Sequence, residues 1–122
     1  MKPDTLTWLK IAETDLGAAE VLLDRGFLPN AIFCSHQVIE KLLKALWVEA
    51  HAEGFPPRTH DLTELAEDLA LNLSAWAAFL KDLTNQSVAS RYADPNAYTH
   101  AEAALYLERT KELWRQLRPQ LN

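Results

Sequence analysis

Residues 33–47 read FCSHQVIEKLLKALW, and this stretch decides the fold. On a helical wheel, at about 100° per residue, its polar and apolar side chains separate onto opposite arcs. The polar arc holds His36, Gln37, Glu40, Lys41 and Lys44. The apolar arc holds Ala31, Ile32, Val38, Ile39, Leu42, Leu43 and Leu46. The spacing predicts an amphipathic helix that runs from Asn30, as N-cap, to about residue 52, before Gly54 and the Pro56-Pro57 pair.

Phe33 and Trp47 lie on the polar arc of this helix, together with Val48. A solvated face rarely carries a phenylalanine and a tryptophan together. Two interpretations stay open: the arc is solvated, or another segment or a second subunit covers it and it takes part in function. His36 and Glu40 are one helical turn apart and can hydrogen-bond, either to hold the helix or to orient a substrate phosphate.

Helical patterns also flank this central stretch, and no alternating β-type run interrupts them. A first helix is expected over about residues 4–25, with Asp4 as its cap and Gly26 as its stop. A long last helix is expected to begin at Asp94-Pro95, as N-cap and first helical residue, and to end at about residue 118. The mainly apolar face of that helix consists of Ala103, Tyr106, Leu107, Thr110, Leu113, Trp114 and Leu117.

Between the central and the last helix, the sequence predicts two shorter elements. Thr59 or Asp61 can cap a short third helix, and Asn72 or Ser74 opens a fourth that runs to about residue 86. The stretch SRYADPN, residues 90–96, is expected to be a loop. The predicted fold class is therefore all-α, an up-and-down bundle of four to five helices.

Composition and charge narrow the class of protein. At 122 residues the chain is expected to form one domain, residues 1–122, large enough for a hydrophobic core. A net charge of −5 disfavours nucleic-acid binding through a global basic field and leaves a local basic patch or a dimer groove open. Cys34, the one cysteine, excludes an internal disulfide framework and fits a reducing cytoplasm. The N-terminal residues predict no signal peptide, and no apolar run predicts a membrane span.

Four ordered motifs carry a resemblance to a known family. Residues 8–23 contain A-x-x-D-L as Ala12, Asp15 and Leu16, and residues 33–45 match F-x-x-x-Q-x-x-E-K-x-L-K-A. Residues 57–62, PRTHDL, match P-x-T-H-x-L, and SRYADPN is similar to an R-Y-P-D loop with Ala93 in place of proline. In these motifs the chain resembles a HEPN domain, the "higher eukaryotes and prokaryotes nucleotide-binding" family.

The resemblance implies a helical bundle that is commonly a homodimer, with its polar positions near a cleft. It also implies nucleotide binding, RNA cleavage, or a nucleotidyltransferase partner in a toxin–antitoxin pair. Ribonuclease members carry R-x(4–6)-H, whereas eight residues separate Arg91 from His100 and one residue separates Arg58 from His60. The ribonuclease assignment therefore cannot be transferred to either pair, and binding is favoured over cleavage.

The candidate ligand-binding residues come from the polar arc and the two later motifs: His36, Gln37, Glu40, Lys41, Lys44, His60, Arg91, Tyr92 and Asp94. For RNA cleavage without metal, Arg91 would stabilise the phosphorane charge, and His100 or His36 would act as the base. Arg91 can instead form an ion pair with a carboxylate, from Asp15, Glu40 or Asp94. The histidines lack metal-ligand spacing, so neither a metal nor a cofactor is expected.

Three hypotheses for the function follow. The first is a dimeric module that binds a nucleotide, RNA or a nucleotidyltransferase through the polar arc and the loop around Arg91. The second is a metal-independent endoribonuclease with an unusual Arg/His pair. The third is a structural partner subunit without a ligand. The eight-residue spacing between Arg91 and His100 favours the first.

Overall fold

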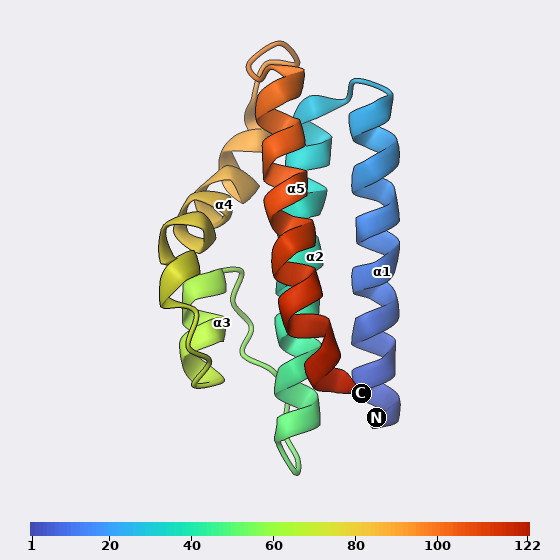
Figure 1. Cartoon of the computed structure of the whole chain (residues 1–122), viewed down its shortest axis with the longest axis vertical. Coiled ribbons are helices and arrows are strands. Elements are labelled where there is room, and N and C mark those ends of the chain that lie inside the picture. The colour runs from blue at the N-terminus through green and yellow to red at the C-terminus, as the bar shows by residue number, and fades with distance from the viewer.

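The computed structural model describes residues 1–122, and all of its regular elements are helices, with no strand. The five α-helices are α1 (Pro3–Asp24), α2 (Leu28–Ala50), α3 (Leu62–Asp68), α4 (Ala77–Ala89) and α5 (His100–Leu117). Three short 3₁₀ turns adjoin α4 and α5: η1 (Ser74–Trp76), η2 (Ser90–Tyr92) and η3 (Arg118–Leu121). The predicted all-α, up-and-down bundle is therefore confirmed (Figure 1). None of the helices combines the length and the apolarity that crossing a membrane requires.

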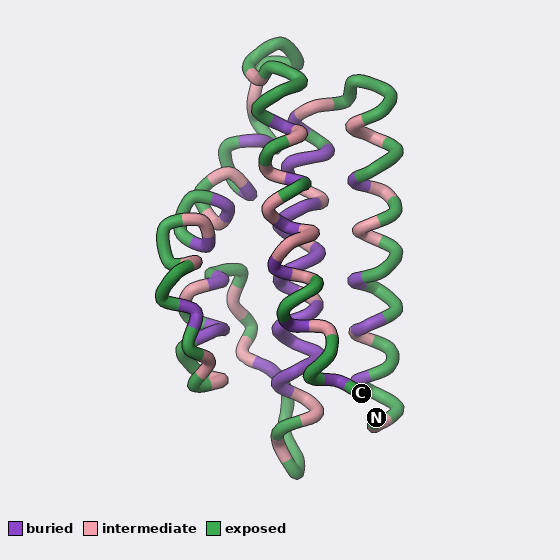
Figure 2. Tube along the Cα trace, viewed as in Figure 1, coloured by how far each residue is buried: buried purple, intermediate pink, exposed green.

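The central element is α2, because 14 of its 23 residues are buried. α1 packs antiparallel beside it, α5 runs in the same direction as α2, and α3 and α4 pack against a further side (Figure 1). Buried positions follow α2 along most of its length, whereas α1 is buried along one stripe (Figure 2). Because α2 is buried on most of its surface, its polar side chains lie against other elements of the chain.

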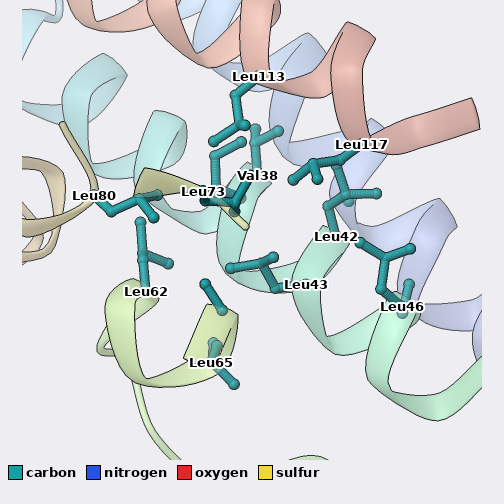
Figure 3. Packing of buried hydrophobic residues seen from close by; sticks show 14 of the residues in the cluster. Val38, Leu42, Leu43, Leu46, Leu62, Leu65, Leu73, Leu80, Leu113 and Leu117 are labelled. Atoms are coloured by element: carbon teal, nitrogen blue, oxygen red, sulfur yellow. The ribbon is translucent and has the colours of Figure 1, made fainter. Parts of the chain in front are cut away.

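Apolar side chains from all five helices, most of them leucines, form the hydrophobic core. Figure 3 shows them meeting in one cluster that includes Val38, Leu42, Leu43, Leu62, Leu65, Leu80, Leu113 and Leu117. Burying a leucine fully contributes about 1.5–3 kcal/mol relative to leaving it exposed. These contacts fix the rotation of α2 about its axis. They therefore also decide where its polar arc lies.

The helix ends follow local signals at some positions and depart from the predictions at others. Gly26 follows Arg25, the C-cap residue of α1, and adopts a φ of +81°, which a glycine allows without steric cost. Asp61 caps α3, as predicted, and its carboxylate accepts the N–H groups of Thr63 and Glu64. The predicted caps of the two long helices are wrong. Lys2 precedes α1, and α2 begins at Leu28 because Pro29 needs no hydrogen-bond partner in a first turn.

The predicted start of the last helix at Asp94-Pro95 is also wrong. α5 begins at His100, where the Thr99 hydroxyl accepts the N–H of Glu102 and the Glu102 carboxylate accepts the N–H of Thr99. This reciprocal capping box satisfies two N–H groups at the helix start. Asp94 instead accepts the N–H of Asn96 within the turn that leads to α5.

Candidate functional site

Three of the five residues of the polar arc are buried and Gln37 and Lys41 are half-buried, so the interpretation of the arc as a solvated face is wrong. Glu40 and His36 have no exposed surface, and Lys44 is 7% exposed. Part of the cover comes from α1, since the ring of Trp8 lies 6.0 Å from Lys41 Nζ and 5.6 Å from Lys44 Nζ. The rest of the cover comes from the segment that joins α2 to α3, through His60.

Glu40 lies at the centre of this arc. Its Oε1 accepts the Nδ1–H of His60 at 2.6 Å, and its Oε2 accepts from Lys41 at 2.9 Å and from Lys44 at 3.2 Å. Burial alone would raise the pKa of Glu40, but the hydrogen bonds from Lys41 and His60 outweigh burial and lower this pKa to about 2. Glu40 is therefore a carboxylate at neutral pH, bound on both oxygens. The predicted hydrogen bond between His36 and Glu40 is not formed.

His36 belongs to the same network as a neutral imidazole. Its Nε2–H donates to the carbonyl of His60 at 2.8 Å, and its Nδ1 accepts from the side-chain amide of Gln37 at 3.3 Å. Burial lowers the pKa of His36 and outweighs the raising effects of the His60 carbonyl and of Glu40. With both nitrogens engaged and no exposed surface, His36 is not placed to act as a base on an external substrate.

The hydrogen bonds close into a ring that joins α2 to the segment before α3. Lys41 Nζ donates both to Glu40 and to the Oε1 of Gln37 at 2.9 Å. His60 completes the ring, because its carbonyl accepts from His36 while its imidazole donates to Glu40. Six predicted site residues thus meet in one network: His36, Gln37, Glu40, Lys41, Lys44 and His60. The His60 side chain is 76% exposed, and its Nε2 has no partner within the chain.

Phe33 and Trp47 are each covered by residues of the same chain. The guanidinium of Arg91 lies 5.5 Å from the centre of the Phe33 ring. His51 stacks on Trp47 with ring centres 3.8 Å apart, and the indole N–H of Trp47 donates to Asp68 at 2.6 Å. The two aromatic residues on the polar arc therefore need no second subunit to cover them.

Arg91 lies in a separate feature, the Arg91 groove, whose lining residues come from the connection between α1 and α2, the first turns of α2 and the segment after α4. Figure 1 shows that this connection lies at one end of the bundle. The groove has a volume of about 490 Å³ and is lined by Gly26, Phe27, Pro29, Asn30, Phe33, Ser90, Arg91, Ala93 and Pro95. The Nε–H of Arg91 donates to the Ser87 carbonyl at 3.0 Å, and no carboxylate pairs with the guanidinium. The predicted ion pair with Asp15, Glu40 or Asp94 is not formed.

The other predicted site residues lie outside this groove. Tyr92 is 82% exposed and does not line the groove, and neither does Asp94. His100, the first residue of α5, is also exposed and lines neither the groove nor the buried network. The structure therefore does not unite Arg91 with His100 or His36 in one site. No group of three or more His, Cys, Asp or Glu side chains is arranged to hold a metal ion.

Sequence reasoning missed several residues of the groove, above all Phe27, Asn30 and Ser90. Ser90 directly precedes Arg91 in the motif SRYADPN, which is a local signal that was present in the sequence. Phe27 and Asn30 lie more than 60 positions away from Arg91, and only the fold brings the two segments together.

A comparison with known protein families agrees with this arrangement of motifs. The model of the HEPN domain matches residues 5–119, nearly the whole chain. The chain therefore belongs to the HEPN domain family, and the resemblance carried by its four motifs is confirmed. Membership supports a nucleotide- or RNA-related module as the general class of the protein. No curated protein and no solved structure matches the chain.

Proposed function

We propose that this HEPN domain binds a nucleotide or RNA in the Arg91 groove and does not cleave RNA. The observation that carries the proposal is the state of the Arg91 guanidinium. It lies over the Phe33 ring, its Nε–H is bound to the Ser87 carbonyl, and its two terminal nitrogens have no partner at the groove. A guanidinium held in this way offers a preformed pair of donors for a phosphate.

The chemistry of the groove walls supports the same proposal. Phe27 and Phe33 supply aromatic surface, on which nucleobases of any kind stack. None of the lining residues is acidic, and Arg91 is the only charged one, so the lining itself carries positive charge in a chain whose net charge is −5. A volume of about 490 Å³ lies in the range of small-molecule sites. One short ligand segment suits such a groove better than a long tract of RNA.

Binding is preferred to cleavage because the groove contains no general base. Cleavage of RNA without metal needs a proton acceptor within hydrogen-bond reach of the attacking 2′-hydroxyl. None of the residues that line the groove is a histidine, an aspartate or a glutamate, so the groove offers no such acceptor.

An endoribonuclease is the second candidate, and one observation favours it. The imidazole of His60 is oriented by the buried carboxylate of Glu40 and presents its unbonded Nε2 to solvent. A histidine backed by a carboxylate is a competent base for an external hydroxyl. His60 does not line the Arg91 groove. Cleavage would therefore have to use His60 and Arg91 separately, or combine His60 of one copy of the chain with Arg91 of another.

The binding test uses fluorescence anisotropy with a labelled RNA hexamer of mixed sequence and a labelled adenine nucleotide. Arg91→Ala should weaken binding at least about tenfold, because a charged hydrogen-bond partner is lost. Arg115→Ala is the matched control, since Arg115 is an exposed arginine of α5 that pairs only with Glu108. Equal loss in both variants, or no binding by the unaltered chain, would contradict the proposal.

The same RNA, analysed on a gel after incubation, separates binding from cleavage. We expect intact RNA with the unaltered chain. Cleavage that His60→Ala abolishes would establish the second candidate. Cleavage that Arg91→Ala and His100→Ala both abolish would instead show that the widely spaced Arg/His pair is active.

We also propose that the protein is a homodimer and works with a nucleotidyltransferase in a toxin–antitoxin pair. The support is the resemblance to such HEPN proteins together with exposed apolar side chains, of Val88, Tyr92 and Leu105. Sedimentation equilibrium at micromolar concentration tests the dimer, and a clean monomer would argue against it. Co-purification with a nucleotidyltransferase encoded beside this protein tests the pair.

A further inference from the structure

We propose that Ser90, Arg91 and the first turn of α2 form a binding site for one phosphate group, and that the ligand of the Arg91 groove is a nucleoside monophosphate. This inference rests on the proposed function and adds the chemical class of the ligand. It is carried by three independent features of the groove: a buried hydroxyl without a partner, an uncapped helix start and a single free guanidinium.

The hydroxyl of Ser90 is the first of these features. Ser90 is 4% exposed and lines the groove, and its Oγ forms no hydrogen bond within the chain. Buried hydroxyls are nearly always hydrogen-bonded, so the unsatisfied hydroxyl of this groove-lining residue is available to a partner from a ligand. A serine hydroxyl reaches another staggered position by rotation about one bond, which allows Oγ to turn toward a ligand.

The start of α2 is the second feature. Phe27, the N-cap residue, forms no side-chain cap, and Pro29 has no N–H. The first turn of this 23-residue helix therefore leaves backbone N–H groups without an intrahelical partner, and Asn30, which carries one of them, lines the groove. The positive end of a helix that is open in this way favours a phosphate.

The amount of positive charge limits the ligand to one phosphate. Arg91 is the only charged residue that lines the groove, and the helix start adds about half a charge. Two or three linked phosphates would bring negative charge that nothing in the groove neutralises. A phosphate monoester is the best match.

The apolar wall accounts for the rest of the ligand. Phe27 is 57% exposed and offers an open aromatic face next to the helix start. One face of Phe33 is already occupied by the Arg91 guanidinium. A planar base attached to the phosphate through a sugar can therefore stack on Phe27 while the phosphate contacts Ser90, Arg91 and the N–H of Asn30.

The test is a ¹H–¹⁵N NMR titration of the full chain with AMP, UMP, adenosine, inorganic phosphate and an RNA hexamer. AMP and UMP should both shift the signals of Asn30, Ser90 and Arg91. Inorganic phosphate should shift the same signals at higher concentration. Adenosine should bind at least about tenfold more weakly than AMP, because it lacks the charged group.

Two substitutions test the role of the hydroxyl against a matched control. Ser90→Ala should weaken AMP binding about threefold to tenfold, which is the expected loss of one hydrogen bond to a charged group. Thr110→Val removes the other buried hydroxyl that has no partner, which lies on α5 outside the groove, and should leave AMP binding unchanged. Since neither hydroxyl is bonded within the chain, both variants are expected to fold.

The outcomes separate this inference from the proposed function. The monophosphate site is overturned if AMP binds no more tightly than adenosine, or if Ser90→Ala leaves AMP binding unchanged. If the hexamer still binds in a way that needs Arg91, the proposed function stands. If the RNA hexamer shifts the signals of Ser90 and Asn30 and no mononucleotide does, the monophosphate is overturned as the ligand. No binding of any of these molecules overturns both.

Discussion

The exposed imidazole of His60 donates its Nδ1–H to the fully buried Oε1 of Glu40 at 2.6 Å. This bond joins two residues that are 20 positions apart and fastens the segment before α3 to the centre of α2. Lys41 and Lys44 occupy the other oxygen of Glu40, so the buried carboxylate faces three donors. The folded chain therefore holds the buried charge of Glu40 with two lysines of the same helix and with His60 from the segment before α3.

Replacing Glu40 is expected to destabilise the fold strongly. Glu40→Gln leaves Lys44, which is 7% exposed, without its counter-charge, and breaking one side of a buried ion pair costs about 3–5 kcal/mol. Urea denaturation followed by circular dichroism measures the change. Glu112→Gln is the control, because Glu112 pairs with Arg109 at the surface and should cost less than about 1 kcal/mol. A loss for Glu40→Gln as small as that of the control would contradict a stabilising role of the network.

Stability is expected to fall in two steps as the pH is lowered. The pKa values of His36 and Glu40 both lie below their ordinary values of 6.5 and 4.5 in the folded chain. At pH values above its ordinary pKa, each group therefore stabilises the fold. This stabilisation is lost as the pH falls from the ordinary pKa through the lower pKa of the folded chain. The first loss begins below pH 6.5 through His36, and the second runs from pH 4.5 to about 2 through Glu40. The second step amounts to about 3 kcal/mol.

The variant His36→Gln separates these two steps. It removes the titrating imidazole, so its free energy of unfolding should change less between pH 7.5 and 5.5 than that of the unaltered chain. The loss at lower pH should remain, because Glu40 is still present. Urea denaturation across this pH range gives both slopes, and an unchanged slope near pH 6.5 in the variant would remove His36 as the cause.

The start of α5 can be tested by comparing two candidate caps. Thr99→Ala removes the hydroxyl that accepts the Glu102 N–H and should cost about 1 kcal/mol. Asp94→Ala removes only the bond to the Asn96 N–H in an exposed turn, so it should cost about half as much or less. Thermal or urea denaturation ranks the two variants. A larger loss for Asp94→Ala would mean that the last helix begins where the sequence pattern placed it.

Cys34 is expected to react slowly with thiol reagents. Burial raises the pKa of its thiol, and the negative charge of Asp15 raises it further. Because the thiolate is the reactive form, the folded chain should react with a disulfide reagent at pH 8 at least about tenfold more slowly than the chain in guanidinium chloride. Asp15→Asn should speed the reaction of the folded chain slightly. Equal rates for folded and unfolded chain would refute the assignment of Cys34 as a shielded thiol.

Much of the fold was predictable because helix formation depends on residues within a few positions of one another. The apolar spacing predicted α2 and the buried face of α5, the glycine at position 26 marked the end of α1, and Asp61 marked the start of α3. The start of α5 was less predictable, because Asp94-Pro95 and Thr99 are both acceptable helix starts. The capping box with Glu102 distinguishes the second, and it was readable as T-x-x-E in the sequence.

The candidate site was predictable in its residue types and not in its geometry. The polar arc and the motif around His60 indicated which side chains would gather, and six of the nine predicted ligand-binding residues do meet. The hydrogen-bond partner of Glu40 differs from the predicted one, since Glu40 accepts from His60 and not from His36. The Arg91 groove combines Phe27 and Asn30 with Ser90 and Arg91, which are about 60 residues later in the chain.

By itself, the sequence determined the helices, the amphipathic pattern of α2 and membership of the HEPN family. Each depends on periodicity or on motifs that are local in the chain. Only the tertiary structure decided that the polar arc is buried, that Arg91 covers Phe33, and that Ser90 lies at a groove without a partner. The physical reason is that these relations depend on how the leucine core rotates and docks each helix, which no short window of sequence contains.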